Sequence, residues 1–421
     1  MNLSDKGWFE KYLDYRQDLD KDTQFHLKLD LNKEHSLYKI VQPTGLMYGH
    51  PIIPPYLQSD NLKGYGESER MKIVLTESLV KSAQLEIENI DREDYKDFVV
   101  ELSKELVDYY LNVFPELEGK TRTFWGKNKP TEKIAEEILE NRLYVKGSLV
   151  DNFWTSFFQN SLLFLDVFYF REWISNKSNI VSNESFRKEK DNIRSSLLKL
   201  IAAASNADNN IQEEERKLFE IFLKSANLDS GKAKEAKTYI DEGLNVNDID
   251  IPRDSWILRK YFLEMAILTV WADRVVDEEE KQFIKDLSIK LDFSEEEMER
   301  SMIAIESFVI TNWNEVHYLQ KKKNYAVVSQ LLVKRLTKVA IKNKNHIGTE
   351  MRESKELMEL ISTSMTRDLT EIEKEKVRTQ LVDILKMLPT FVVIALPGTF
   401  LTLPILLKVL PKSAFPSAFQ E

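Results

Sequence analysis

The sequence predicts an all-α protein built from multi-helix bundle domains. Glycine and proline are scarce, with 12 of each in 421 residues, and residues that favour helices are common. From residue 68 onward apolar residues recur at spacings of three and four, the period of an amphipathic helix. A chain of this length has room for two or three such domains.

Charge and cysteine content narrow the class of protein. The formal net charge is −10, so a face that binds nucleic acid directly is not expected, because such faces need clustered Lys and Arg. The chain has no cysteine, and therefore no thiolate ligand for zinc and no disulfide framework. The first residues are too charged for a secretory signal peptide. We expect most of the chain to lie in the cytoplasm.

Residues 1–180 are expected to form an N-terminal helical domain. Residues 1–66 are aromatic and irregular, and 50–69 are rich in turn residues, which predicts a loop. Apolar spacing then predicts four helices. Their ranges are 67–90, 92–114, 129–145 and 149–175.

The fourth of these helices, 149–175, is unusually apolar, with Asp166 as its only interior charge. Its aromatic and polar residues favour a central helix buried by its neighbours. A membrane segment is the alternative.

A second helical domain is predicted at 186–310, because the chain contains an internal repeat. The motif ADNNIQEEE, from Ala207, recurs as ADRVVDEEE, from Ala272, with a constant offset of 65. Each copy lies between two amphipathic segments, so each predicts a helix, a short acidic turn and a second helix. The acids would begin the second helix and complement its positive end. Ser294 with Glu297 predicts a further helix with a capping box.

The repeated motif A-D-x-x-[IV]-x-E-E-E resembles the tellurite-resistance TerB-like domain, a helical bundle with acidic motifs at its two helical turns. The resemblance implies that the acids hold a divalent cation, calcium or magnesium, and carboxylate oxygens suit such hard ions. The implied ligands are Asp208, Glu214, Asp273 and Glu279. The alternative is that these acids only cap helices.

The C-terminal region, 320–421, has the most distinctive pattern. No charged residue lies between Lys386 and Lys408, and about twenty apolar residues can span a bilayer. Prolines interrupt this apolar segment, 387–411, and each frees a carbonyl that needs another partner in lipid. The pattern favours a kinked hairpin or a contact in a homo-oligomer over a straight span. The residues that define the membrane segment are Pro389, Pro397, Pro404, Lys408 and Pro411.

A basic amphipathic run at 321–344 precedes the apolar segment. It predicts either a solvated face on a packed helix or contact with anionic lipid headgroups.

Four motifs stand out in the last sixty residues. They are Leu369-Thr370-x-x-Glu373, Asp383-Ile384-Leu385-Lys386-x-x-Pro389, Leu403-Pro404-x-x-Leu407-Lys408-x-x-Pro411 and Pro416-Ser417-Ala418-Phe419. These motifs resemble the membrane-associated part of the LETM family. With the TerB-like middle, the chain resembles the LETM-related biofilm-associated proteins of the Bacteroidetes. The resemblance implies partners in inner-membrane lipid, a tie to potassium/proton or calcium/proton exchange, and ribosome binding.

One departure from the LETM pattern and one property of the apolar segment argue against the inherited activities. The soluble part that follows the P-S-T-F motif in the family is not in this sequence, which ends at Glu421. Residues 387–407 contain no ionisable side chain, and transport pathways normally need one within the membrane.

No pattern typical of an enzyme is found. The five histidines are scattered, without a His-x-x-x-His pair for zinc, and the sequence has no phosphate-binding lysine loop and no nucleophile elbow. We expect no catalytic residue and no organic cofactor.

The leading expectation is a non-enzymatic protein on the cytoplasmic side of the inner membrane, with a role in cation homeostasis or in envelope and biofilm physiology. One alternative is a soluble TerB-like module that senses metal or binds protein. Another is a ribosome-binding or cation/proton exchange role taken from the LETM family.

Overall fold

The structure is a computed structural model of the chain, and it divides into two compact units, Met1–Leu291 and Asp292–Glu421, each described by itself. Among the described residues there are twelve α-helices, with short 3-10 helices and no strand, which confirms the all-α prediction. The predicted domain limits stay predictions. The described residues are 6–22, 32–54, 57, 64–86, 95–117, 129–143, 160–176, 183–207, 211, 213–252, 254–272, 278–311, 370, 372–373 and 376.

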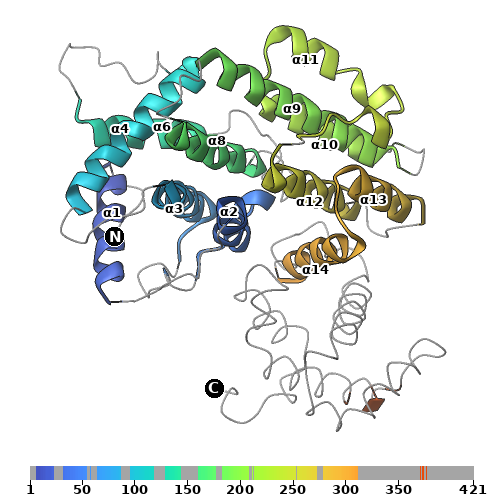
Figure 1. The fold of residues 1–421 in the computed structure, drawn as a ribbon, viewed down its shortest axis with the longest axis horizontal. Helices are drawn as coiled ribbons and strands as arrows, with labels where there is room; N and C mark the ends of the chain where they lie inside the picture. Colours follow the sequence, from blue (N-terminus) through green and yellow to red (C-terminus); the bar gives the residue numbers. More distant parts are fainter. Residues whose placement is uncertain are drawn as a thin grey trace. The chain divides into compact units, whose positions relative to one another are not determined.

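In the first half of unit 1, the described residues form six α-helices. Figure 1 shows them in blue to green. Helix α8 packs on α3 and α4, while α6 packs on α4 and α1. Helices α3, α4 and α6 confirm three of the predicted helices, whereas α1 and α2 lie where the sequence analysis expected irregular structure. The bounds are α1 Trp8–Asp22, α2 Lys33–Val41, α3 Glu67–Glu86, α4 Tyr95–Val113, α6 Thr131–Leu143 and α8 Leu163–Ser175.

Helix α8 is a central buried helix, as predicted for the part of 149–175 that is described. Asp166 is fully buried and receives two hydrogen bonds from Arg142, at 2.6 and 2.9 Å, and one from the hydroxyl of Tyr110 at 3.2 Å. Pairing with a guanidinium is what makes a carboxylate tolerable in this position. No helix in the described ranges is both long and apolar enough to cross a membrane.

The second half of unit 1 contains the repeat. Helix α9 packs against α10 and α12, and α12 packs against α13 (Figure 1). Helices α10 and α13 begin at the acidic motifs, 65 residues apart, as the repeat predicts. The bounds are α9 Asn183–Ser205, α10 Glu213–Ala226, α11 Ser230–Ala236, α12 Trp256–Ala272 and α13 Glu278–Lys290.

The repeat extends well beyond the acidic motif. Arg194 on α9 donates from Nη1 to the carbonyl oxygen of Ala226 at 3.0 Å, and Arg259 on α12 donates from Nη1 to that of Leu291 at 2.8 Å. The next residue in each copy has a left-handed backbone, with φ of 45° and 60°, which ends the second helix of each copy. In both copies, an arginine of the first helix therefore binds the backbone at the end of the second helix, at equivalent positions.

In unit 1, charged side chains within one helix bind backbone groups at the end of another helix. Glu136 on α6 accepts from the amides of Gly7 and Phe9, at 2.8 and 3.0 Å, at the start of α1. Lys190 on α9 donates to the carbonyl of Val113, at 3.1 Å, at the end of α4. Acids at helix starts and cations at helix ends satisfy groups that lack partners within the helix and complement its dipole.

Unit 2 contains α14, Glu295–Thr311. Ser294 and Glu297 form the predicted capping box, with backbone-to-side-chain distances of 2.9 and 3.2 Å. Thr370 and Glu373, in the L-T-x-x-E motif, form the same box at 2.8 and 3.3 Å. The apolar segment 387–411 lies outside the described residues.

Candidate functional site

In the described part of unit 1, a cluster of buried polar side chains lies where residues 32–48 meet α12. Helix α2 begins at this place because Asn32 caps it, accepting from the amides of Glu34 and His35 at 2.8 and 3.2 Å. Tyr38 lies four residues after Glu34, so both side chains are on one face of α2. That face contacts α12.

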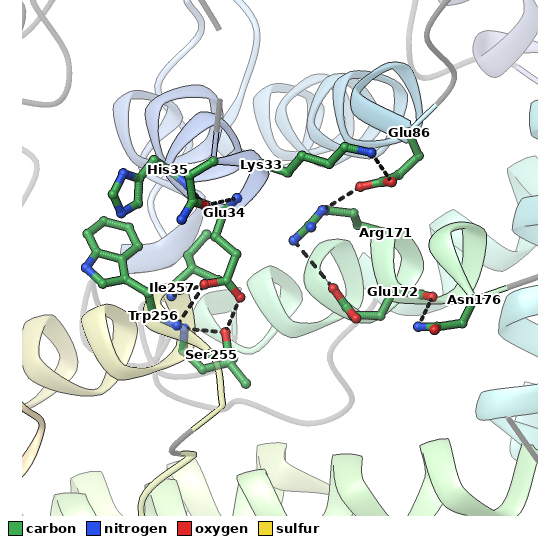
Figure 2. Close-up of polar contacts among 12 residues, drawn as sticks. Lys33, Glu34, His35, Glu86, Arg171, Glu172, Asn176, Ser255, Trp256 and Ile257 are labelled. Atoms are coloured by element: carbon green, nitrogen blue, oxygen red, sulfur yellow. Dashed lines mark hydrogen bonds and ion pairs between the residues drawn. The ribbon is translucent and has the colours of Figure 1, made fainter. Parts of the chain in front are cut away.

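Glu34 caps α12 from outside that helix. Its carboxylate accepts from the hydroxyl of Ser255 at 2.7 Å and from the amides of Trp256 and Ile257 at 2.7 and 3.2 Å (Figure 2). A carboxylate at a helix start satisfies free amides and complements the positive end of the dipole. The N-terminal region and the second copy of the repeat are thereby joined by a side chain 221 positions away in the sequence.

Aromatic contacts continue the interface along α2. The ring of His35 lies 4.1 Å from that of Trp256, and Tyr38 meets Trp256 edge-on at 5.5 Å. Such edge-on pairs add to the stability gained from area burial alone.

Glu264 on α12 is the centre of the buried cluster. This carboxylate is fully buried and accepts from the hydroxyl of Tyr38 and, at 2.8 Å, from that of Tyr48. Lys260, one turn earlier on α12, lies 4.0 Å away and is also buried. Two phenol donors and one cation supply the partners that a buried carboxylate requires.

The second tyrosine is held by a tight turn of two 3-10 helices, Gln42–Thr44 and Leu46–Tyr48. Gly45 joins them with φ of +69°, and a Cβ at this position would lie 2.1 Å from the carbonyl oxygen of His50. Only glycine fits both the backbone conformation and the space. Gln42 donates to the Tyr48 hydroxyl at 3.0 Å, which orients the phenol toward Glu264.

Burial, and next the charge of Glu264, raise the pKa of Tyr38 and of Tyr48 well above the usual value for a phenol. Both tyrosines therefore keep their protons at any physiological pH and act as fixed hydrogen-bond donors. The cluster positions α2, the turn and α12 relative to one another. The cluster therefore has a structural role, and its residues, Glu34, Tyr38, Tyr48 and Glu264, are called the latch below.

A second polar network lies beside the contacts of Glu34 (Figure 2). Glu86, at the end of α3, pairs with Arg171 of α8 and Lys33 of α2, both at 2.8 Å. Arg171 also lies 3.4 Å from Glu172. Burial raises the pKa of Glu172; Arg171 opposes this, while Glu34 and Glu86 add to it.

The acids predicted as metal ligands are only partly described. Asp208 and Asp273 lie outside the described residues, and so does the side chain of Glu214. Glu279 is exposed in the first turn of α13, where it complements the helix dipole. Among the described side chains no group of three or more His, Asp or Glu could hold a metal ion. The cation site stays a prediction.

The residues chosen to mark the membrane segment, which are Pro389, Pro397, Pro404, Lys408 and Pro411, lie outside the described residues.

The residues of the buried latch were not predicted from sequence. Glu34, Tyr38, Tyr48 and Glu264 are joined by contacts that span more than 200 positions. One local signal was present: Asn32 before a short amphipathic run is typical of a helix start.

Comparisons with family models, with curated proteins and with solved structures find no match for this chain. The resemblances to the LETM family and to TerB-like domains therefore rest on the motifs of the sequence.

Proposed function

We propose that this protein is a non-enzymatic, membrane-associated helical protein of LETM type, with unit 1 as a helical body on the cytoplasmic side of the membrane. The observation that carries the proposal is the uncharged segment between Lys386 and Lys408 in a chain that is 30% charged. A segment of that length and composition favours the interior of a bilayer. The basic run at 321–344 supports a surface of anionic lipid beside it.

The geometry of unit 1 fits a structural role. At the α2–α12 interface, Glu34 binds the start of α12, and Glu264 accepts from two buried tyrosines. Both tyrosines there are held as neutral donors. Such an arrangement stabilises one packing of the helices. The biological setting, cation homeostasis or biofilm physiology, comes from the LETM resemblance.

Flotation with liposomes that contain anionic lipid tests the proposal on the full chain. The parent protein is expected to float with the vesicles. Val393→Asp with Leu401→Asp should reduce the floating fraction strongly, because each charge costs about 2.5–3.5 kcal/mol at the centre of a span. Ile289→Asp is the matched control, since Ile289 is an exposed apolar residue of α13. Equal flotation of the double variant and the control would reject the proposal.

A divalent cation at the acidic turns is the second candidate function. It is favoured by the equivalent placement of the two motifs at the starts of α10 and α13. Calorimetry with calcium, and then with magnesium, should give heat with the parent protein and none with Asp208→Ala combined with Asp273→Ala. An absence of heat from the parent protein with both ions would reject this candidate.

A further inference from the structure

Helices α8 and α9 form an antiparallel hairpin whose register is set by two contacts. Near the connection, the rings of Trp173 and Phe186 lie 5.8 Å apart. Two turns along, Arg194 lies 3.9 Å from Asp166. In an antiparallel helix pair, the residue numbers of two residues that face one another add up to a constant. For α8 and α9 this constant is about 360, as both contacts show. Tyr169 therefore lies level with 190–191.

Tyr169 has an unusual environment at this point of the hairpin. The side chain is 1% exposed, yet its hydroxyl has no hydrogen-bond partner among the described residues. A buried hydroxyl without a partner costs about 1–3 kcal/mol. Burial, and next the charge of Glu189, raise its pKa well above the usual value, so the phenol keeps its proton. The hydroxyl is thus a buried group on which the charge of an acid of the neighbouring helix acts.

Charged groups from several elements act on Tyr169, Glu172 and Glu189. Burial is the largest cause of the raised pKa of Glu172. Arg171 lowers this pKa, and the charges of Glu34, Glu86 and Glu189 raise it further. The charge of Asp254, after partial burial, disfavours the charged form of Glu189. The charged groups that act on Tyr169 are Glu172 of α8 and Glu189, Asp191 and Arg194 of α9. Those that act on Glu172 or Glu189 include Arg171 of α8, Glu34 of α2, Glu86 of α3 and Asp254 before α12. The buried Lys190 of α9 lies 3.8 Å from Asp191.

We propose that Tyr169 and Glu189 form a proton-sensitive clasp between α8 and α9. Glu189 is exposed. A carboxylate that moved against a buried phenol among other acids would lose more hydration than the contact restores. The neutral carboxyl group has a smaller desolvation cost and escapes the repulsion of Asp254. Once protonated, Glu189 turns inward and supplies the hydrogen-bond partner that the hydroxyl of Tyr169 lacks.

The sign of the pH effect follows from the raised pKa of Glu189. The folded state binds the proton more readily than the unfolded state, whose Glu titrates at about 4.3. The hairpin therefore gains stability as the pH falls through the raised value toward that of the unfolded chain. Mild acid closes the clasp and neutral pH releases it.

Hydrogen–deuterium exchange of the full chain at pH 7.5 and pH 5.0, corrected for intrinsic exchange rates, tests the clasp. Amides of α8 and of the first half of α9 in the parent protein should gain protection by about threefold to tenfold at pH 5.0, the range expected for one added hydrogen bond. Glu189→Gln cannot titrate at this position, and Tyr169→Phe has no hydroxyl, so both should show a clearly smaller gain than the parent protein; the part that stays belongs to Glu172, whose pKa burial also raises. Glu220→Gln, at an exposed acid of α10, is the matched control and should keep it.

Two results would overturn the clasp. If Tyr169→Phe keeps the full gain, the hydroxyl is not the partner and only relief of repulsion remains. Should that variant fail to fold, Glu189→Gln decides alone, and a gain equal to that of the parent protein refutes the proposal.

Discussion

Arg194 and Arg259 lie 65 positions apart and make the same hydrogen bond, each from Nη1 to a backbone carbonyl 32 residues further along the chain. The acceptors are at the ends of α10 and α13, where helix carbonyls lack partners within the helix. A guanidinium there also complements the negative end of the dipole. The internal repeat of the sequence is thus a repeat of helix pairs, each locked by an arginine from its first helix.

Replacing either arginine should open its helix pair. Arg194→Met and Arg259→Met are each expected to cost about 2 kcal/mol of unfolding free energy, because a buried carbonyl loses a charged donor. Arg194→Met should cost more, since Asp166 also loses a nearby cation. Urea unfolding measures both. Lys199→Met, which removes an ion pair to the exposed Asp250, is the control and should cost less than about 1 kcal/mol. Equal losses in all three variants would contradict this role.

The cap that Glu34 supplies to α12 can be tested by removing its carboxylate. Glu34→Ala should destabilise unit 1 by about 0.5–2 kcal/mol, the usual value of a helix cap, and should raise amide exchange in the first turn of α12. Glu67→Ala removes an exposed acid from the first turn of its own helix, α3, and should change stability by less than about 1 kcal/mol. Unchanged exchange at Trp256 and Ile257 in Glu34→Ala would show that the cap contributes nothing.

The turn that presents Tyr48 should not tolerate a side chain at Gly45. Gly45→Ala puts a Cβ 2.1 Å from the carbonyl oxygen of His50 and forces φ of +69° on alanine. The expected cost is about 1–3 kcal/mol from strain, with more from the clash. At Gly66 the nearest atom to such a Cβ is the Glu69 carboxylate at 3.8 Å, so Gly66→Ala makes no clash and should cost no more than about 1 kcal/mol, the loss from placing alanine just before α3. Thermal unfolding of both variants decides, and a neutral Gly45→Ala would rule out the turn as described.

Acid should weaken the contact between Arg16 and Glu77. Burial alone would raise the pKa of Glu77, but Arg16, Lys81 and Tyr12 lower it overall, and Arg16 lies 2.8 Å away. The stability from this depressed pKa is complete above the unfolded value of about 4.3 and is lost as the pH falls through the folded value. In denaturant titrations between pH 5 and pH 2, Glu77→Gln should show a shallower loss of stability than the parent protein. Identical slopes would exclude Glu77 as a contributor.

Local sequence signals predicted the helices better than they predicted the contacts. The starts of α3 and α6, at Glu67 and Thr131, and the capping box at Ser294 follow from nearby residues, which is why pattern and propensity find them. Helix α1 was missed because charges interrupt its apolar pattern, and α2 because it has only nine residues. The repeat was visible because its acidic motif is short and nearly identical in both copies.

The latch around Glu264 had no comparable signal. A glutamate in an apolar helix predicts some buried partner, but nothing near α12 in the sequence indicates two tyrosines more than 200 positions away. Such partners are selected by the packing of α2 against α12, which a local pattern does not encode. The same holds for Glu34, whose acceptor role exists only once α12 lies beside α2.

Fractionation of cells that express the full chain, followed by an alkaline wash of the membranes, tests the central claim most directly. Alkaline conditions release proteins held by charge alone, whereas apolar segments inside the bilayer stay with the lipid. The account predicts that the protein remains in the washed membrane pellet and that Val393→Asp with Leu401→Asp moves it to the supernatant. Recovery of the parent protein in the aqueous fraction would contradict the proposed membrane association.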